Sequence, residues 1–233
     1  MVEQLLNFLY HCWPSLALAC LLAYLLGSVN SAIIVTRIIS GRDIRDFGSG
    51  NAGATNVLRS QGVVPALITT AGDVGKSIGS VYLGGWLVEA MNPGFSGGEL
   101  ELAIIGKYAA GLCCILGHLF PIYFKFRGGK GVLATFGMIL ILDYRIALIC
   151  LGVFIIVVAI FRMVSLGSIC AALALPALTG LFSAYVDCRP PTNTLSSVIL
   201  STLIAATVIL KHIPNIRRII NGTESKLGKK KEE

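Results

Sequence analysis

Residues 16–39 read LALACLLAYLLGSVNSAIIVTRII, a stretch with a single charged side chain, Arg37. About 20 apolar residues in a helix suffice to cross the ~30 Å hydrocarbon core of a bilayer. Comparable apolar stretches follow along the chain, at 63–89, 101–117, 131–142, 146–161, 166–186 and 195–211. They predict an all-α integral membrane protein with about seven transmembrane helices. Six is the alternative, because the stretches at 131–142 and 146–161 are short.

The composition agrees with this class. Hydrophobic residues make up 55% of the 233 residues and charged residues only 13%, whereas a soluble domain carries about 25% charged residues. No repeat of fixed period interrupts the chain, so we expect a single transmembrane domain over residues 1–233 with a short basic tail from about residue 222. The first seven residues contain Glu3 and no Lys or Arg, which argues against a cleavable signal peptide.

Connections that are rich in basic residues alternate with connections that contain few of them. Segments 40–62, 124–130 and the tail from 211 are rich in Lys and Arg, whereas the connections near 90–100, 143–145 and 186–194 contain only Arg145 and Arg189. By the positive-inside rule the first set is cytoplasmic, so with seven helices the N-terminus lies outside and the C-terminus inside. The net charge of +7 then indicates a basic surface beside anionic lipid and no nucleic-acid partner.

The cysteines and histidines indicate no metal centre and no disulfide framework. Seven cysteines form no CxxC pair, and five of them fall within predicted helices, where a thiol packs as a small apolar group. The three histidines, at 11, 118 and 212, lie far apart in the sequence. We expect neither a metal ion nor a cofactor.

The stretch GSGNAGATNVLR, residues 48–59, is unusual for a connection between membrane helices. Glycines free the backbone to turn its N–H groups toward one side, which makes an anion-binding nest. The glycines of this stretch are Gly48, Gly50 and Gly53, the side-chain donors are Ser49, Asn51, Thr55 and Asn56, and the terminal guanidinium is that of Arg59. Together they predict a phosphate site at a membrane surface.

A second glycine-rich basic stretch, GHLFPIYFKFRGGKG, covers residues 117–131 on the same predicted face. Pro121 ends or bends a helix, and Gly128, Gly129 and Lys130 lie in a flexible turn where backbone and ammonium can approach one anion. The alternative is a positive-inside loop with glycine hinges.

Smaller polar groups accompany these loops. Ser165 is either a helix cap or a ligand contact. His212 and Asn215 share a face at i, i+3 if the helix continues through Pro214. Asp73 and Lys76, in the second apolar stretch, either neutralise one another or serve a function, since charges within a membrane are functional candidates.

These motifs resemble a known family, the bacterial acyl-phosphate:glycerol-3-phosphate acyltransferases. The matching segments are LLGS (25–28), DIRDFGSGNAGATNVLR (43–59), GHLFPIYFKFRGGKG (117–131), VSLGSI (164–169) and HxxNIRRIxxGTE (212–224). One departure is Asn30, where the family often has proline. The resemblance implies a seven-helix enzyme of the bacterial inner membrane with its site on the cytoplasmic side. It also implies acyl transfer from acyl phosphate to the 1-hydroxyl of glycerol 3-phosphate, giving lysophosphatidic acid and phosphate.

The resemblance also implies roles for individual residues. Ser49 and the glycines around it match the loop that holds the donor phosphate, to which Asn51, Thr55 and Asn56 also belong. The positions that match contacts to glycerol 3-phosphate or the reaction centre are Arg59, Lys130, Ser165, His212 and Asn215. The hydroxyl proton passes either to His212 or to an oxygen of a substrate phosphate.

Two absences suit an activated donor. The sequence contains neither an HxxxxD acyltransferase signature nor a GxSxG nucleophile elbow. An acyl phosphate is already activated, and its departure needs mainly charge neutralisation. The alternative function is a transporter for phosphate-bearing anions, since basic loops beside membrane helices suit that as well.

Overall fold

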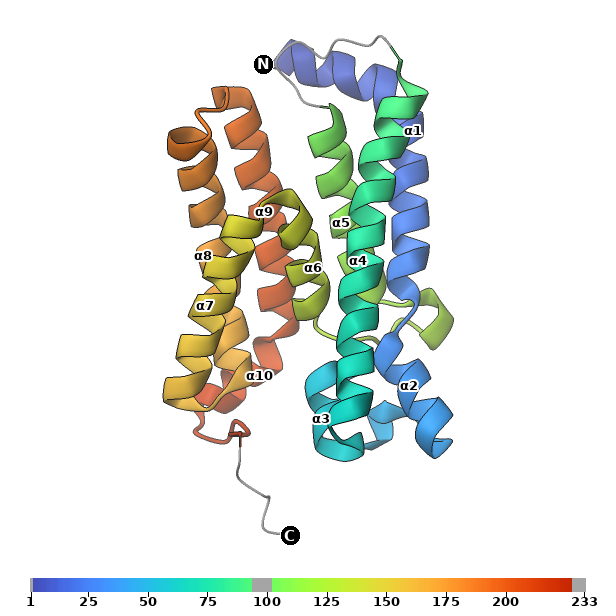
Figure 1. Ribbon diagram of the computed structural model, residues 1–233, viewed down its shortest axis with the longest axis vertical. Coiled ribbons are helices and arrows are strands. Elements are labelled where there is room, and N and C mark those ends of the chain that lie inside the picture. The colour runs from blue at the N-terminus through green and yellow to red at the C-terminus, as the bar shows by residue number, and fades with distance from the viewer. Residues whose placement is uncertain (1, 94–101, 228–233) are drawn as a thin grey trace. The chain divides into compact units, whose positions relative to one another are not determined.

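The computed structural model describes residues 2–93 and 102–227, and within these ranges all regular structure is helical (Figure 1). The helices are α1 (Val2–Ser28), α2 (Ser31–Ser40), α3 (Ala54–Gln61), α4 (Val63–Met91), α5 (Leu102–Leu119), α6 (Val132–Leu142), α7 (Tyr144–Phe161), α8 (Val164–Leu181), α9 (Pro191–Lys211) and α10 (Ile213–Ile220). Short helical turns are η1 (Ile44–Asp46), η2 (Ile122–Phe124) and η3 (Phe182–Val186).

Each predicted apolar stretch is mainly helical where the structure describes it. Within residues 2–93 and 102–227, five helical segments are long and apolar enough to cross a membrane: Tyr10–Ser40, Leu102–Phe124, Tyr144–Phe161, Val164–Val186 and Pro191–Lys211. Of the other two stretches, α4 has 29 residues, whereas α6 has 11, which is about 17 Å of helix and short of the bilayer core. The prediction of an all-helical membrane protein is confirmed; the count of seven spans and the orientation stay predictions.

The chain divides into two compact units, residues 1–142 and 143–233. Unit 1 contains α1 to α6, and unit 2 contains α7 to α10. The single domain expected from the sequence stays a prediction. Part of the connection expected outside the membrane, residues 94–101, and the end of the basic tail, residues 228–233, lie beyond the described residues.

The first predicted span is broken in the structure. α1 ends at Ser28, and α2 starts afresh after Asn30, whose side chain accepts a hydrogen bond from the Ile33 N–H at 3.1 Å. Such a cap satisfies a backbone donor that a new helix leaves unpaired. α1 also begins earlier than expected, at Val2, and it bends along its length in Figure 1. Pro14 within this helix removes one backbone hydrogen bond, which accounts for the bend.

Small residues let the helices of unit 1 approach closely. A Cβ atom built on Gly106 of α5 would lie 2.6 Å from the Gly84 carbonyl oxygen and 2.9 Å from Val88 Cγ2, both in α4. Likewise, a Cβ on Gly27 of α1 would collide with the backbone of Cys114 in α5. In Figure 1 these three helices run side by side. Close backbone approach through small residues is typical of helix packing in membranes.

We expect Gly106→Ala to destabilise unit 1, because the added methyl overpacks the α4–α5 contact. The expected loss is about 1–3 kcal/mol in the free energy of unfolding, measured by denaturation in detergent. Gly75→Ala in α4 is the matched control, since a Cβ there meets nothing within 4 Å. It should stabilise the protein by about 0.5–1 kcal/mol, as alanine does in an open helical position. Equal effects of the two substitutions would contradict the close contact.

Candidate functional site

The first glycine-rich loop connects α2 to α3 through tight left-handed turns. Gly48 has φ +52° and Gly50 has φ +69°, conformations that residues with a side chain rarely adopt. Ser49, between these glycines, is exposed. The loop therefore presents a serine and two glycines at the surface of unit 1.

Asn56 organises this loop from below. It is buried, and its Oδ1 accepts a hydrogen bond from the Ser49 N–H at 3.1 Å. Its Nδ2 lies 3.1 Å from the Ile44 carbonyl, 2.9 Å from that of Phe47 and 3.1 Å from that of Asn51. The sequence interpretation grouped Asn56 with the substrate-contacting residues. In the structure the side-chain amide of Asn56 is hydrogen-bonded to the loop backbone.

The backbone donors of the loop divide into two groups. The N–H groups of Ser49, Gly50 and Gly53 donate within the loop, to Asn56 Oδ1, the Phe47 carbonyl and the Asn51 carbonyl. The other group opens α3, where Gly53 is the cap and places no side chain over the helix end. First-turn N–H groups such as those of Ala54 and Thr55 have no acceptor within their own helix, and the helix dipole favours an anion there. Arg59 is exposed in the last turn of α3.

The second glycine-rich loop, residues 120–131, packs back onto the end of α5. The Gly128 N–H donates to the Leu119 carbonyl at 3.3 Å and the Gly129 N–H to the His118 carbonyl at 3.1 Å. A Cβ on Gly129 would lie 2.6 Å from the Ala52 carbonyl of the first loop. Glycine is therefore needed there for close approach of the two loops, and half-buried Lys130 follows directly.

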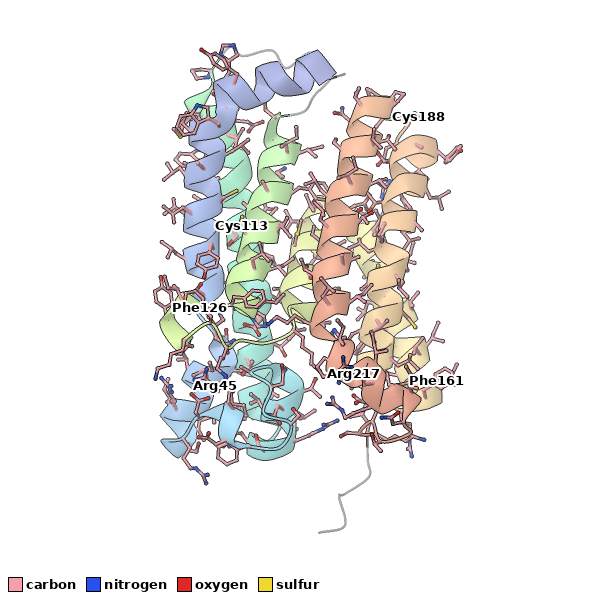
Figure 2. The ribbon with its side chains drawn as sticks, turned by 180° about the vertical axis from the view of Figure 1, so that it is seen from behind. Arg45, Cys113, Phe126, Phe161, Cys188 and Arg217 are labelled. Atoms are coloured by element: carbon pink, nitrogen blue, oxygen red, sulfur yellow. The ribbon has the colours of Figure 1, made fainter. Side chains whose placement is uncertain are left out.

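Arg45 joins the two loops. Its Nη1 donates to the carbonyls of Phe124 and Arg127, each at 3.0 Å, while its Nε and Nη2 donate to the Asp43 carboxylate at 2.9 and 2.8 Å. Figure 2 shows Arg45 beneath the segment that carries Phe126. Hydrogen bonds from Arg45 lower the pKa of Asp43 to about 2 despite partial burial, so this carboxylate stays charged at neutral pH. The two basic loops thus form one continuous surface of unit 1.

Unit 2 brings two of its predicted site residues, Ser165 and Asn215, together at Glu224. The Glu224 Oε1 accepts hydrogen bonds from Ser165 Oγ and Asn215 Nδ2, each at 2.7 Å, and Oε2 accepts one from Arg218 Nε at 2.7 Å. The sequence allowed Ser165 to be either a helix cap or a ligand contact. In the structure Ser165 lies inside α8 and Met163 occupies the N-cap position, so Ser165 is not the cap. Its hydroxyl instead ties the start of α8 to the residues after α10.

His212 lies at the junction of α9 and α10. Its Nδ1 is 2.8 Å from the Val208 carbonyl, an acceptor only, so Nδ1 is the protonated nitrogen and the neutral ring has its lone pair on Nε2. The Ile216 N–H donates to the His212 carbonyl at 2.8 Å, so helical register continues from His212 to Asn215. Pro214 falls in the first turn of α10, where proline is tolerated. Both His212 and Asn215 are buried.

Sequence reasoning missed two residues that hold these arrangements. Glu224 lies in the recognised GTE segment, but nothing in its spacing showed that its carboxylate would face Ser165 and Asn215. Arg45 was counted only as a positive charge of the loop. Among the described residues, no group of three or more His, Cys, Asp or Glu side chains could hold a metal ion.

We expect Arg45→Lys to loosen the second loop, because lysine cannot reach the Asp43 carboxylate and two carbonyls together. Amide exchange of a peptide covering 119–131, measured by hydrogen–deuterium exchange, should accelerate about ten- to hundredfold. Arg42→Lys is the control, since Arg42 is exposed and its guanidinium stacks over the Phe47 ring at 4.7 Å, outside the second loop. Unchanged exchange in Arg45→Lys would show that other contacts join the loops.

The contacts of Glu224 with Ser165, Asn215 and Arg218, here called the Glu224 cluster, predict that the stability of the protein depends on pH. Burial raises the pKa of Glu224, but hydrogen bonds from Ser165, Asn215 and Arg218 and the charge of Arg218 outweigh this, so the pKa lies below its ordinary value. A lowered folded-state pKa stabilises the protein above the ordinary glutamate pKa of about 4.3, and this stabilisation is lost as the pH falls further.

Glu224→Gln should therefore melt below wild type at pH 6–8, and the gap should close below about pH 4. Thermal unfolding in detergent across this range measures the gap. Glu89→Gln, which changes an exposed carboxylate of α4, is the control. A gap that is independent of pH would exclude the charge of Glu224 as its source.

Comparison with known proteins gives a consistent result. A family model described as glycerol-3-phosphate acyltransferase matches residues 17–222. The chain is 39% identical over 210 residues to a glycerol-3-phosphate acyltransferase of Clostridioides difficile, covering 90% of this chain and 94% of the relative. It is 38% identical over 214 residues to one of Thermosynechococcus vestitus, covering 91% and 95%.

Solved structures agree with these relatives. The crystal structure of PlsY (YgiH), an integral membrane glycerol 3-phosphate acyltransferase, in its glycerol 3-phosphate form is similar with a TM-score of 0.76. The sequence identity is 28%, and the match covers 92% of this chain and 96% of that one. The lysophosphatidic acid form of that protein matches with a TM-score of 0.73 and 27% identity.

Proposed function

Because the chain belongs to the glycerol-3-phosphate acyltransferase family, we propose that it transfers an acyl group from acyl phosphate to the 1-hydroxyl of glycerol 3-phosphate. In this reaction the hydroxyl oxygen forms an ester bond with the acyl carbon, and the bond between that carbon and the phosphate oxygen breaks. The products are lysophosphatidic acid and inorganic phosphate. We assign substrate-binding residues, from the family resemblance, to the loops of unit 1 and, separately, to Ser165, His212 and Asn215 of unit 2.

The observation that carries this proposal is the pair of loops joined by Arg45. Both reactants bear a phosphate, and the joined segments carry two cations, Arg59 in the last turn of α3 and Lys130 in the second loop. Arg59 offers a planar fork for two oxygens, and Lys130 a compact charge. The open start of α3 adds backbone donors for an anion. We assign the donor phosphate to the loop around Ser49 and the cations to stabilising phosphate charge.

The chemistry asks little of the protein besides binding and orientation. The acyl phosphate is a mixed anhydride whose leaving group departs once its charge is neutralised. Holding the acceptor hydroxyl close to the acyl carbon lowers the remaining barrier. No covalent intermediate on the protein is required, in keeping with a sequence that lacks a nucleophile elbow.

Unit 2 offers a group for the proton of the attacking hydroxyl. The Nε2 lone pair of His212, set by the hydrogen bond from Nδ1 to Val208, can accept it. A phosphate oxygen of a substrate is the alternative acceptor. Asn215 and Ser165, positioned by Glu224, are assigned to the glycerol 3-phosphate. The variant His212→Gln distinguishes the two routes. If His212 is the base, the substitution abolishes turnover and leaves substrate affinity unchanged. If a substrate phosphate accepts the proton, turnover is retained.

We place the site on the cytoplasmic side of a bacterial inner membrane, where the positive-inside rule puts the basic loops. The acyl chain and the lipid product then stay in the membrane while glycerol 3-phosphate enters from water. This orientation gives the exposed apolar residues of α1 and α7 a lipid environment; Leu21 and Ile156 are 55% and 60% exposed.

A direct assay tests the proposal. Purified protein in detergent is supplied with palmitoyl phosphate and glycerol 3-phosphate, and lysophosphatidic acid and phosphate are measured. We expect both products in equal amounts, and none with palmitoyl-CoA as donor. Uptake of glycerol 3-phosphate into vesicles without any product would favour the transporter instead.

Arg59→Ala is expected to raise the Michaelis constant for glycerol 3-phosphate about ten- to hundredfold. A charge-assisted hydrogen bond to phosphate is worth roughly 1.5–3 kcal/mol, which corresponds to that change. Steady-state kinetics with each substrate varied in turn measures the effect. Arg42→Ala is the control, because the Arg42 guanidinium stacks over the Phe47 ring at 4.7 Å. If Arg59→Ala and Lys130→Ala both leave the constants unchanged, these cations only set the topology.

A further inference from the structure

Three ionisable side chains are buried together inside unit 1, beneath the two loops. Asp73 and Lys76 are one turn apart on α4, and His118 lies in the last turn of α5. Their exposed fractions are 1%, 8% and 3%. Burying a charge is unfavourable unless the charge is paired, and such residues within membrane helices commonly serve a function. The acyl transfer described above uses none of the three.

Lys76 is the centre of this cluster. Its Nζ lies 2.9 Å from Asp73 Oδ1, 3.0 Å from His118 Nδ1 and 2.8 Å from the carbonyl oxygen of Val29. An ammonium group only donates, so His118 Nδ1 is the acceptor and the ring proton is on Nε2. The contact with Asp73 is an ion pair, and the contacts with Val29 and His118 are hydrogen bonds. The His118 Nδ1 also lies 3.5 Å from Asp73 Oδ1, so the three side chains form one compact cluster.

One hydrogen bond of Lys76 leads to the first loop. Val29 lies at the break between α1 and α2, and the next residue, Asn30, caps α2. The Asn30 Nδ2 is 3.5 Å from the carbonyl oxygen of Ala52, inside the loop of residues 48–59. Lys76 thus binds the backbone at Val29, and the neighbouring residue Asn30 contacts the first loop.

The other hydrogen bond leads to the second loop. The carbonyl of His118 accepts the Gly129 N–H at 3.1 Å. Gly129 also lies directly against the His118 ring, since a Cβ there would collide with Nε2 and lie 2.6 Å from the Ala52 carbonyl. Gly129 is therefore wedged between the imidazole and the first loop. The position of the His118 ring sets how closely the two loops approach.

We propose that Lys76, held by Asp73, is a positioning residue for acyl transfer that fixes the relative placement of the two glycine-rich loops through Val29 and His118. The inference rests on the proposed function, because it matters for catalysis only if Arg59 and Lys130 act on the same substrates. Arg45 joins the loops from the solvent side, and Lys76 joins them from the membrane interior. A displacement of about 1 Å at a reaction centre can cost about a hundredfold in rate.

The competing interpretation is that Asp73 and Lys76 merely neutralise one another. Single substitutions do not separate the two ideas, because either one leaves a buried charge unpaired and destabilises the helix packing. A charge-balanced double variant does. Asp73→Asn/Lys76→Met removes both charges of the ion pair together and also removes both hydrogen bonds of the ammonium.

We expect Lys76→Met alone to lower the melting temperature in detergent and the double variant to recover most of the loss. In the double variant, kcat/KM per folded molecule should stay about ten- to hundredfold below wild type, with an altered Michaelis constant for glycerol 3-phosphate. Reduced stability alone would lower kcat in proportion to the folded fraction and leave the Michaelis constant unchanged. Thr69→Val is the matched control, since Thr69 is buried in α4 and bonds only within that helix.

Hydrogen–deuterium exchange supplies a readout that is independent of activity. Peptides covering residues 48–59 and 119–131 should exchange faster in the double variant and not in Thr69→Val. If the double variant does not fold, Lys76→Arg is tested instead, because it keeps the charge opposite Asp73 but changes the donor geometry; it too should lower kcat/KM and accelerate exchange. A folded variant with wild-type kinetics and wild-type exchange in both loops would overturn the proposal. Absent activity in the wild-type protein would contradict the proposed function, and the exchange experiment would still decide the role of Lys76.

Discussion

The guanidinium group of Arg45 holds the two loops of unit 1 together, because it donates hydrogen bonds to oxygen atoms of both segments. Loop carbonyls that lie outside regular structure must find donors elsewhere. Arg45 supplies them to Phe124 and Arg127 while Asp43 fixes its orientation. Two segments whose contacting residues are 79 and 82 positions apart in the sequence are thereby brought into one basic surface. Buried beneath it, Lys76 connects the same loops through its own hydrogen bonds.

Much of this could be predicted from the sequence because membrane helices have a strong signal. Apolar stretches of sufficient length are forced to be helical, since a bilayer provides no partner for unpaired backbone groups. In the described residues each of the seven predicted stretches is mainly helical, the first of them as two helices. The glycines of the first basic loop predicted a sharply turning backbone, and in the structure Gly48 and Gly50 adopt left-handed conformations.

What the sequence did not reveal depends on contacts between distant segments. Asn30 looked like part of a continuous apolar helix, yet its capping hydrogen bond begins a new one. Asn56 resembled a ligand donor, but its amide is engaged by the loop backbone. Glu224 had no distinguishing spacing, because its partners Ser165 and Asn215 come from other helices. Patterns of period and composition carry no information about such pairings, whereas the family resemblance indicated which segments matter.

We propose that the two joined loops bind phosphate as a single site. A crystal structure with glycerol 3-phosphate and a non-transferable phosphonate analogue of palmitoyl phosphate would test this. We expect electron density for phosphate groups beside both loops, with side-chain nitrogens of Arg59 and Lys130 within about 3 Å of phosphate oxygens. Phosphate or phosphonate groups bound elsewhere, with both cations facing only solvent or lipid headgroups, would contradict it.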